Sequence, residues 1–259
     1  MKQRPWAALL ALAAAAAACR TGPPPAIPRE IAQCVPPGTM VLAGARLEAL
    51  RASPLYPRLP ASAVAFLQPF RDASDLLLVF NGADLLLIAR GHFREAAPGA
   101  TLAGGNLMLS GSAALVQAAL AQRRSGAPGS KDLLAQAEAG AAGHEIWAAT
   151  RGGVNLPLTG DASNLNRLLW LAQFATVGLR AEPPMQLDFA AQCATPGAAN
   201  HLEETLRAFL SLAAAGVARQ KELAAILKAA DVRRDGERVQ AALRVPADAM
   251  PEILELFGR

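Results

Sequence analysis

The sequence predicts an α+β fold built from two related units, each a small, mostly antiparallel sheet with helices packed on one side. Apolar runs at residues 76–80 and 84–89 flank Asn81-Gly82, which is the pattern of a β-hairpin. The order strand, loop, helix, strand, strand occurs in residues 39–89 and recurs in residues 145–191, which indicates a structural duplication. The pattern leaves open whether the two sheets join into one continuous sheet.

The first unit spans residues 38–143. It opens with an expected strand at Thr39–Leu47 and a proline-punctuated helical segment at Pro54–Phe70, which includes Ala61–Leu67. The hairpin follows, and Asn81-Gly82 supplies the positive backbone angles that a tight turn requires. Both hairpin strands are apolar at consecutive positions, which predicts that both of their faces are covered.

The first unit closes with one more strand and two helices. The strand is expected at Asn106–Leu109, and the helices at Ala113–Arg123 and Lys131–Ala139. Ser112 stands immediately before the first of these helices, where a serine hydroxyl can cap the free backbone N–H groups. Leu115 and Ala119 belong to the apolar stripe of the same helix.

The second unit spans residues 144–259 and contains an additional pair of helices. Its strands are expected at Glu145–Thr150, Thr176–Ala181, Met185–Ala191 and Glu237–Val245. Its helices are expected at Ser163–Phe174, Ala198–Ala215, Ala218–Ala230 and Asp248–Phe257. The second and third of these helices have no counterpart in the first unit, so they form an inserted pair. The charged run Arg233–Arg238 surrounds an Asp-Gly turn and is expected to be a solvated hairpin tip.

The N-terminal residues have the three-part layout of an export signal. Lys2 and Arg4 are cationic, Trp6–Ala18 is an uncharged apolar run, and small alanines precede Cys19. The run is shorter than the roughly 20 apolar residues that a membrane-spanning helix needs. Residues 1–18 are therefore expected to be a signal peptide.

Residues 1–19 resemble the export and lipidation signal of a bacterial lipoprotein, with Ala16 where that family usually carries leucine. The resemblance implies that Cys19 is acylated and becomes the mature N-terminus, so that membrane lipid holds the protein in the cell envelope. Residues 19–37 then form the lipidated cysteine and a proline-rich tether. The alternative is ordinary cleavage to a soluble secreted or periplasmic protein, with Cys19 unmodified.

Two cysteines remain after Cys19, and their state is open at this point. In an oxidising compartment Cys34 and Cys193 could form a disulfide that closes a loop of about 160 residues. The alternative is two separate buried thiols that behave as small apolar residues.

Composition and motifs exclude several classes of function. Without residues 1–18 the chain has 23 basic and 21 acidic residues, a net charge of about +2, which argues against a nucleic-acid partner. The three histidines, His92, His144 and His201, are about fifty residues apart and lack metal-ligand spacing. Ser110-Gly111-Ser112-Ala113 lacks the flanking glycines of a nucleophile elbow. No catalytic, cofactor or metal residues are assigned from the sequence.

The expected function is therefore a membrane-anchored envelope lipoprotein that binds or scaffolds a protein or an apolar ligand, more readily than an enzyme. The alternative is a secreted hydrolase in which His92, His144 or His201 meets a serine and a carboxylate from distant parts of the chain. A third alternative is a structural or inhibitory module, which would carry a large exposed apolar patch and no concave pocket.

Overall fold

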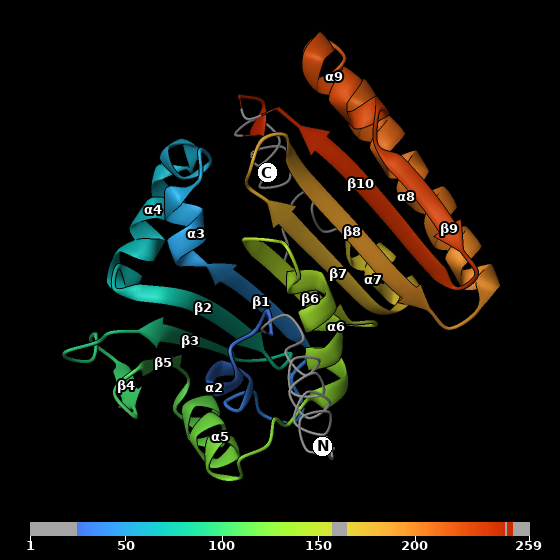
Figure 1. The fold of residues 1–259 in the computed structure, drawn as a ribbon. Helices are drawn as coiled ribbons and strands as arrows, with labels where there is room; N and C mark the ends of the chain where they lie inside the picture. Colours follow the sequence, from blue (N-terminus) through green and yellow to red (C-terminus); the bar gives the residue numbers. More distant parts are fainter. Residues whose placement is uncertain (1–24, 157–164, 247, 251–259) are drawn as a thin grey trace, which may run out of the picture.

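A computed structural model describes residues 25–156, 165–246 and 248–250. The export signal, Cys19 and most of the expected helix Asp248–Phe257 lie outside these residues. Within them the protein is an α+β fold around one continuous antiparallel sheet (Figure 1), which confirms the predicted class.

The sheet has ten described strands, and every pair of neighbours is antiparallel. The strands are β1 (Val41–Arg46), β2 (Ala73–Phe80), β3 (Leu85–Gly91), β4 (Ala100–Ala103), β5 (Leu107–Gly111), β6 (Ile146–Arg151), β7 (Ala172–Arg180), β8 (Met185–Cys193), β9 (Asp231–Asp235) and β10 (Arg238–Val245). Their spatial order is β4-β5-β3-β2-β1-β6-β7-β8-β10-β9.

The strand order is the same in the two halves of the sheet. Counted outward from the centre, it is β1, β2, β3, β5, β4 in one direction and β6, β7, β8, β10, β9 in the other. The halves meet where β1 pairs with β6, with Val41 opposite Thr150 and Ala45 opposite Ile146. The duplication that appears in the sequence as a pattern is therefore also present in the topology.

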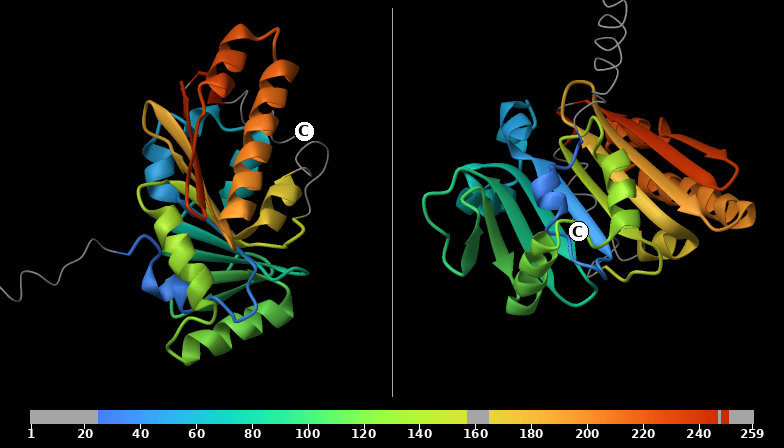
Figure 2. Two further views of the ribbon diagram at one scale, coloured as in Figure 1. Left: turned by 90° about the vertical axis from the view of Figure 1, so that its right-hand side faces the viewer. Right: turned by 60° about the horizontal axis from the view of Figure 1, so that its bottom comes forward.

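Helices lie on both faces of this sheet (Figure 2). One face, here called the α6 face, carries α2 (Arg29–Ala32), α5 (Ala113–Arg124) and α6 (Lys131–Ala141). The opposite face, here called the α8 face, carries α3 (Leu47–Ala52), α4 (Ala61–Leu67), α7 (Leu165–Leu171), α8 (Pro196–Gly216) and α9 (Lys221–Lys228).

The strands of the first half are apolar on both faces, and this explains the two layers of helices. Leu77 and Ile88 belong to the buried cluster of the α6 face, whereas Leu76 and Ala89 belong to a cluster on the α8 face. The prediction that both hairpin faces are covered is confirmed. The placement of all helices on one side was wrong, because successive side chains of a strand point to opposite faces and each apolar face needs its own cover.

The turn predicted at Asn81-Gly82 and the helix cap predicted at Ser112 are both present in the structure. The hairpin of β2 and β3 has a loop of four residues, in which Gly82 has φ 101°. The Asn81 side chain accepts hydrogen bonds from the backbone N–H groups of Ala83 and Asp84, at 2.9 and 2.8 Å. The Ser112 hydroxyl accepts one from Leu115 N–H at 3.3 Å and caps α5.

Four short elements escaped sequence analysis, namely α2, α3, β4 and β9, and one boundary was misplaced. α2 lies within the expected tether 19–37, and that expectation was wrong for its described part, because Ile27, Ile31, Cys34 and Val35 are buried in the cluster of the α6 face. The expected helix Ser163–Phe174 ends at Leu171, and Ala172 to Phe174 already belong to β7. Residues 157–164 lie outside the described part of the chain. The run Arg233–Arg238 forms the exposed β9–β10 hairpin, as expected, but Arg234 also pairs with Glu203 of α8 at 3.1 Å.

The two halves differ in how the α6 face is covered. In the first half α2 and α5 lie over β3 and β5, and α6 lies over the centre of the sheet, beside β6 and β7. Beyond α6, none of the described helices lies over β8, β10 or β9 on this face (Figure 2). Ala249 and Met250, at the end of the described chain, are buried in a cluster on the α8 face. The outer part of the second half is therefore open on the α6 face.

Candidate ligand-binding site on the open half of the sheet

Polar side chains stand where the first half of the sheet has leucine and isoleucine. The α6 face of the first half presents Leu77 and Val79 on β2, Leu86 and Ile88 on β3, and Leu107 and Leu109 on β5, all buried. The corresponding strands of the second half present Thr176 on β7, Asp188 and Gln192 on β8, and Arg238 and Gln240 on β10. Such a surface does not require an apolar helix to cover it.

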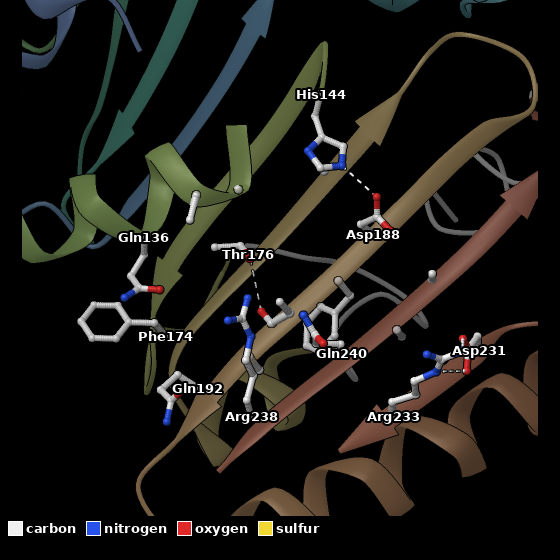
Figure 3. A pocket seen from close by; sticks show the side chains of 18 residues that line it. Gln136, His144, Phe174, Thr176, Asp188, Gln192, Asp231, Arg233, Arg238 and Gln240 are labelled. Carbon is white, nitrogen blue, oxygen red and sulfur yellow. Dashed lines mark hydrogen bonds and ion pairs between the residues drawn. The ribbon is translucent and has the colours of Figure 1, made fainter. Parts of the chain in front are cut away.

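This polar surface is hollowed into a cavity of about 460 Å³ (Figure 3). Its floor is formed by β7, β8, β10 and β9, and its wall by Gln136, Ala139 and Gly140 of α6. Small residues in the floor, such as Ala190 and Ala242, leave the space, because longer side chains there would fill it. The volume lies within the usual range for pockets that bind small molecules.

His144 and Asp188 close one end of the cavity. The Nε2 atom of His144 lies 2.8 Å from Oδ2 of Asp188, and Oδ1 of Asp188 accepts a hydrogen bond from Gln186 at 2.7 Å. The His144 ring lies over Gly178, where a Cβ would approach ring Cγ to 2.5 Å. Its Nδ1 atom is buried and has no hydrogen-bond partner among the described residues. Both ring nitrogens therefore face the protein rather than the cavity.

Arg238 contributes a positive charge to the floor of the cavity. It is exposed at the first position of β10, and within the described residues its guanidinium has no ion pair or hydrogen bond. The other arginine of the cavity, Arg233, is already paired with Asp231 at 2.6 Å. Arg238 is thus the cavity arginine whose donors remain available to a ligand.

Phe174 provides an apolar part beside the α6 wall. Its ring lies under the guanidinium of Arg151, at 5.7 Å from the ring centroid, a cation–π geometry. Arg151 also forms a hydrogen-bonded ion pair with Asp132 of α6. The hydrogen bond from Arg151 lowers the pKa of the Asp132 carboxyl below its ordinary value. The contact joins α6 to β6 and β7 and fixes the position of the cavity wall.

The residues that the sequence offered as candidates for catalysis or metal binding lie in different parts of the structure. Of the three histidines, His144 alone lines the cavity, whereas His92 follows β3 and His201 is exposed on α8. Ser112 caps α5 and lies on the other half of the molecule. Thr176 is the one side-chain hydroxyl among the described lining residues, and it donates to the carbonyl of Ala190 at 3.4 Å. The described residues contain no group of three or more His, Cys, Asp or Glu that could hold a metal ion.

Cys34 and Cys193 are free thiols in different parts of the core. Cys34 is buried in the cluster of the α6 face, and Cys193 in a cluster on the α8 face. Burial raises the pKa of both thiols. The structure therefore has the arrangement of two separate buried thiols rather than a bridge.

The polar residues of the cavity were not singled out by sequence analysis, although a signal for them exists. Gln186, Asp188 and Gln192 on β8, and Arg238, Gln240 and Arg244 on β10, have the even spacing of one strand face. Alternation of this kind is typical of a strand with one solvated face.

Comparisons with known proteins bear on the fold. No family model matches the sequence, and no curated protein matches it. Crystal form III of TP0453 is similar in structure, with a TM-score of 0.50 and 10% identity over 86% of this chain and 96% of that chain. Crystal form I of TP0453 aligns with a TM-score of 0.48 and 10% identity over 88% and 98% of the two chains. At this identity the likeness concerns the fold alone. Among the described residues, no helix has the length and apolar character needed to cross a bilayer.

Proposed function

We propose that this chain is a membrane-anchored envelope lipoprotein that binds a small polar ligand on the open half of its sheet. One observation carries the proposal: two halves with the same strand order differ in that one is sealed by apolar helices and the other presents a polar cavity. Where the first half needs leucine for its core, the second has amides and charges. Such side chains stabilise a fold little, so a binding role explains their place.

The anchoring part of the proposal rests on residues 1–19, whose cationic start, apolar run and Cys19 resemble a lipoprotein signal, and the first described residues show where the segment that follows joins the fold. The backbone N–H groups of Ala26 and Ile27 donate to the Glu138 carboxylate on α6, at 2.8 Å and 3.2 Å. This clamp fixes where the N-terminal segment joins the fold, on the side of the sheet that also bears the cavity. Cys19 precedes Ala26 by seven positions in the sequence, and a chain of that length spans at most about 25 Å when fully extended.

Fractionation of cells tests the anchor. We expect the wild-type protein in the membrane fraction and Cys19→Ala in the soluble fraction, because acyl chains give strong membrane affinity. An equal distribution of the two forms would remove the anchor from the proposal and leave the binding site.

A cavity-filling substitution tests the binding site. In Ala190→Phe, a ring is placed on the floor between Thr176 and Gln240. Ala135→Phe is the matched control, because Ala135 is exposed on α6 and does not line the cavity. We expect small polar fragments to shift amide NMR resonances of β7, β8 and β10 in the wild type and the control, and to leave Ala190→Phe unchanged. Absence of such shifts in the wild type would overturn the binding function.

A hydrolase is the second candidate, because His144 and Asp188 form a hydrogen-bonded pair at the edge of the cavity. Two features count against it. Serine and cysteine are absent from the described residues that line the cavity, and Nδ1 of His144 lies against Gly178, where it cannot take a proton from a nucleophile. Hydrolysis of nitrophenyl esters by the wild type that disappears in His144→Gln would favour this candidate over the binding module.

A further inference from the structure

We propose that Arg238 anchors an oxyanion-binding subsite in the open cavity, so that the ligand carries a carboxylate or a phosphate group. This inference rests on the proposed binding function and specifies the chemistry of its ligand. It starts from the hydrogen-bond and ion-pair partners of the charged side chains that line the cavity.

The acidic groups of the cavity already have partners. Asp188 is held by His144 and by Gln186, at 2.8 and 2.7 Å. Asp231 is held by Arg233 at 2.6 Å. Asp235 is opposite Arg238 on the neighbouring strand, but the two side chains do not form an ion pair within 4.0 Å. Arg238 is therefore the charged side chain of the cavity that has no hydrogen bond or ion pair with the described residues.

The neighbours of Arg238 are suited to an oxyanion. Gln240 is the next residue on the same face of β10, and its side-chain amide has no hydrogen bond among the described residues. Gln192, directly opposite on β8, already donates to the Cys193 carbonyl and to the Glu237 carboxylate, each at 3.4 Å. Figure 3 shows the Arg238 side chain rising from the floor between these strands, toward Thr176. A guanidinium has five N–H donors in a planar fork that matches two oxygens of a carboxylate or phosphate, and the side-chain amide of Gln240 can donate to a remaining oxygen.

The rest of the cavity is suited to the less polar part of such a ligand. Ala139 is part of the α6 wall and Phe174 lies beside it, and Ala190 forms the floor next to Thr176. A cavity of about 460 Å³ is larger than a single inorganic anion needs. The shared chemistry is an oxyanion on an organic stem, and its source is either a free metabolite or the headgroup of an anionic lipid.

Two substitutions on β10 separate this subsite from a general effect of charge. Arg238→Gln and Arg244→Gln each remove one positive charge from an exposed position on the same strand and the same face. Arg238 lines the cavity and Arg244 does not. Arg238→Lys is the third variant, since it keeps the charge and loses the planar fork. Circular dichroism and a urea unfolding curve verify that each variant is folded.

The probes are phenyl phosphate, benzoate and the uncharged benzyl alcohol, titrated into the full-length protein and followed by amide NMR. Sedimentation of the unacylated Cys19→Ala protein with phosphatidylglycerol vesicles and with phosphatidylcholine vesicles forms the lipid arm. We expect Arg238→Gln to bind the anions at least roughly tenfold more weakly, Arg238→Lys to be intermediate, and Arg244→Gln to stay within about twofold of the wild type. Binding of the soluble anions indicates a free ligand, and Arg238-dependent binding of phosphatidylglycerol vesicles alone indicates a headgroup.

Three results would overturn the subsite. If Arg238→Gln and Arg244→Gln weaken anion binding equally, the effect is one of net charge. If benzyl alcohol shifts the cavity resonances and the anions do not, the cavity binds ligands but not oxyanions. If none of the probes shifts the resonances, in solution or on vesicles, the binding function and the subsite fall together.

Discussion

Gly178 of β7 lies directly beneath the imidazole ring of His144, so close that a Cβ would come within 2.5 Å of ring Cγ and 2.7 Å of Nδ1. The contact holds the ring flat against the sheet, where Nε2 reaches Asp188. Glycine is thus required here by close approach rather than by backbone angles, because Gly178 is not among the glycines with positive φ.

Substitution of this glycine is expected to destabilise the protein. In Gly178→Ala the added methyl group must displace the His144 ring, which is buried, and the free energy of unfolding should fall by about 1–3 kcal/mol. Urea unfolding measures the change. Gly216→Ala is the control, because no atom lies within 4 Å of a Cβ at that position. A Gly178→Ala protein as stable as the control would show that the ring moves aside without cost.

Glu203 links the inserted helix α8 to the edge strand β9, and it predicts a pH dependence. Its carboxylate accepts a hydrogen bond from Arg207 at 2.9 Å and another from Arg234 at 3.1 Å. The hydrogen bond from Arg207 is the main cause that lowers the pKa of Glu203, and the hydrogen bond from Arg234 lowers it further. The pKa of Glu203 in the folded protein is below its value of about 4.3 in the unfolded chain. The carboxylate therefore contributes its full stabilisation of the fold above the unfolded-state pKa, and this contribution is lost as the pH falls through the folded-state pKa.

The measurement is a series of urea midpoints between neutral and strongly acidic pH. Glu203→Gln should lower the midpoint at neutral pH, and its difference from the wild type should shrink as the solution is acidified. Glu204→Gln serves as the comparison, since the neighbouring carboxylate accepts a hydrogen bond from Asn200 and pairs with no arginine in the described structure. A difference between Glu203→Gln and the wild type that persists unchanged into acid would contradict this account.

The two buried cysteines should be unreactive while the protein is folded. Cys34 and Cys193 are both fully buried, and burial raises the pKa of each thiol, which reduces the reactive thiolate. Iodoacetamide at mildly alkaline pH should leave both peptides unmodified until urea is added, and then modify both. Peptide mass spectrometry reads the result. A Cys34–Cys193 linked peptide in the native protein would mean that the chain adopts a different core.

The clamp at Glu138 should control the mobility of the N-terminal segment. Glu138→Ala removes the acceptor for the backbone N–H groups of Ala26 and Ile27. Hydrogen exchange of residues 26–31 should accelerate roughly tenfold, while the strands keep their protection. Gln136→Ala, on the opposite flank of α6, is expected to leave these amides unchanged. Equal exchange in both variants would show that Ile27 and Ile31, which are buried, hold the segment without the clamp.

The long central strands could be predicted from the sequence better than the short edge strands and the short helices. The reason is that a long apolar run gives a clear sequence pattern, whereas a short element does not. Long apolar runs with a distinct turn, such as the hairpin around Asn81, are recognisable because local chemistry decides them. β4 and β9 are short edge strands, and β9 is highly charged, so their pairing is decided by neighbours distant in sequence. α3 begins directly after β1 without a side-chain cap, which leaves no signal at its start.

The cavity was harder to foresee, because it depends on which face of the second half lacks a helix. The alternation in β8 and β10 indicates that one face of these strands is polar. It does not indicate that α6 lies along one side of this face and forms the wall of a cavity. His144 and Asp188 are 44 positions apart in the sequence, and their contact depends on the space that Gly178 leaves for the imidazole ring. Gly178 belongs to no sequence motif that would indicate this. Each residue looks ordinary in the sequence and gains its role from the register of β7 with β8.

The charges of β9 also bear on whether two copies of the chain can pair through this edge of the sheet. Two molecules that aligned their β9 rims in opposite directions over all five residues would set Arg233 against Arg233 and Asp231 against Asp235. Repulsion between like charges makes such a seam unfavourable. The charges of β9 therefore disfavour extension of the sheet at this edge by a second copy of the chain in that register.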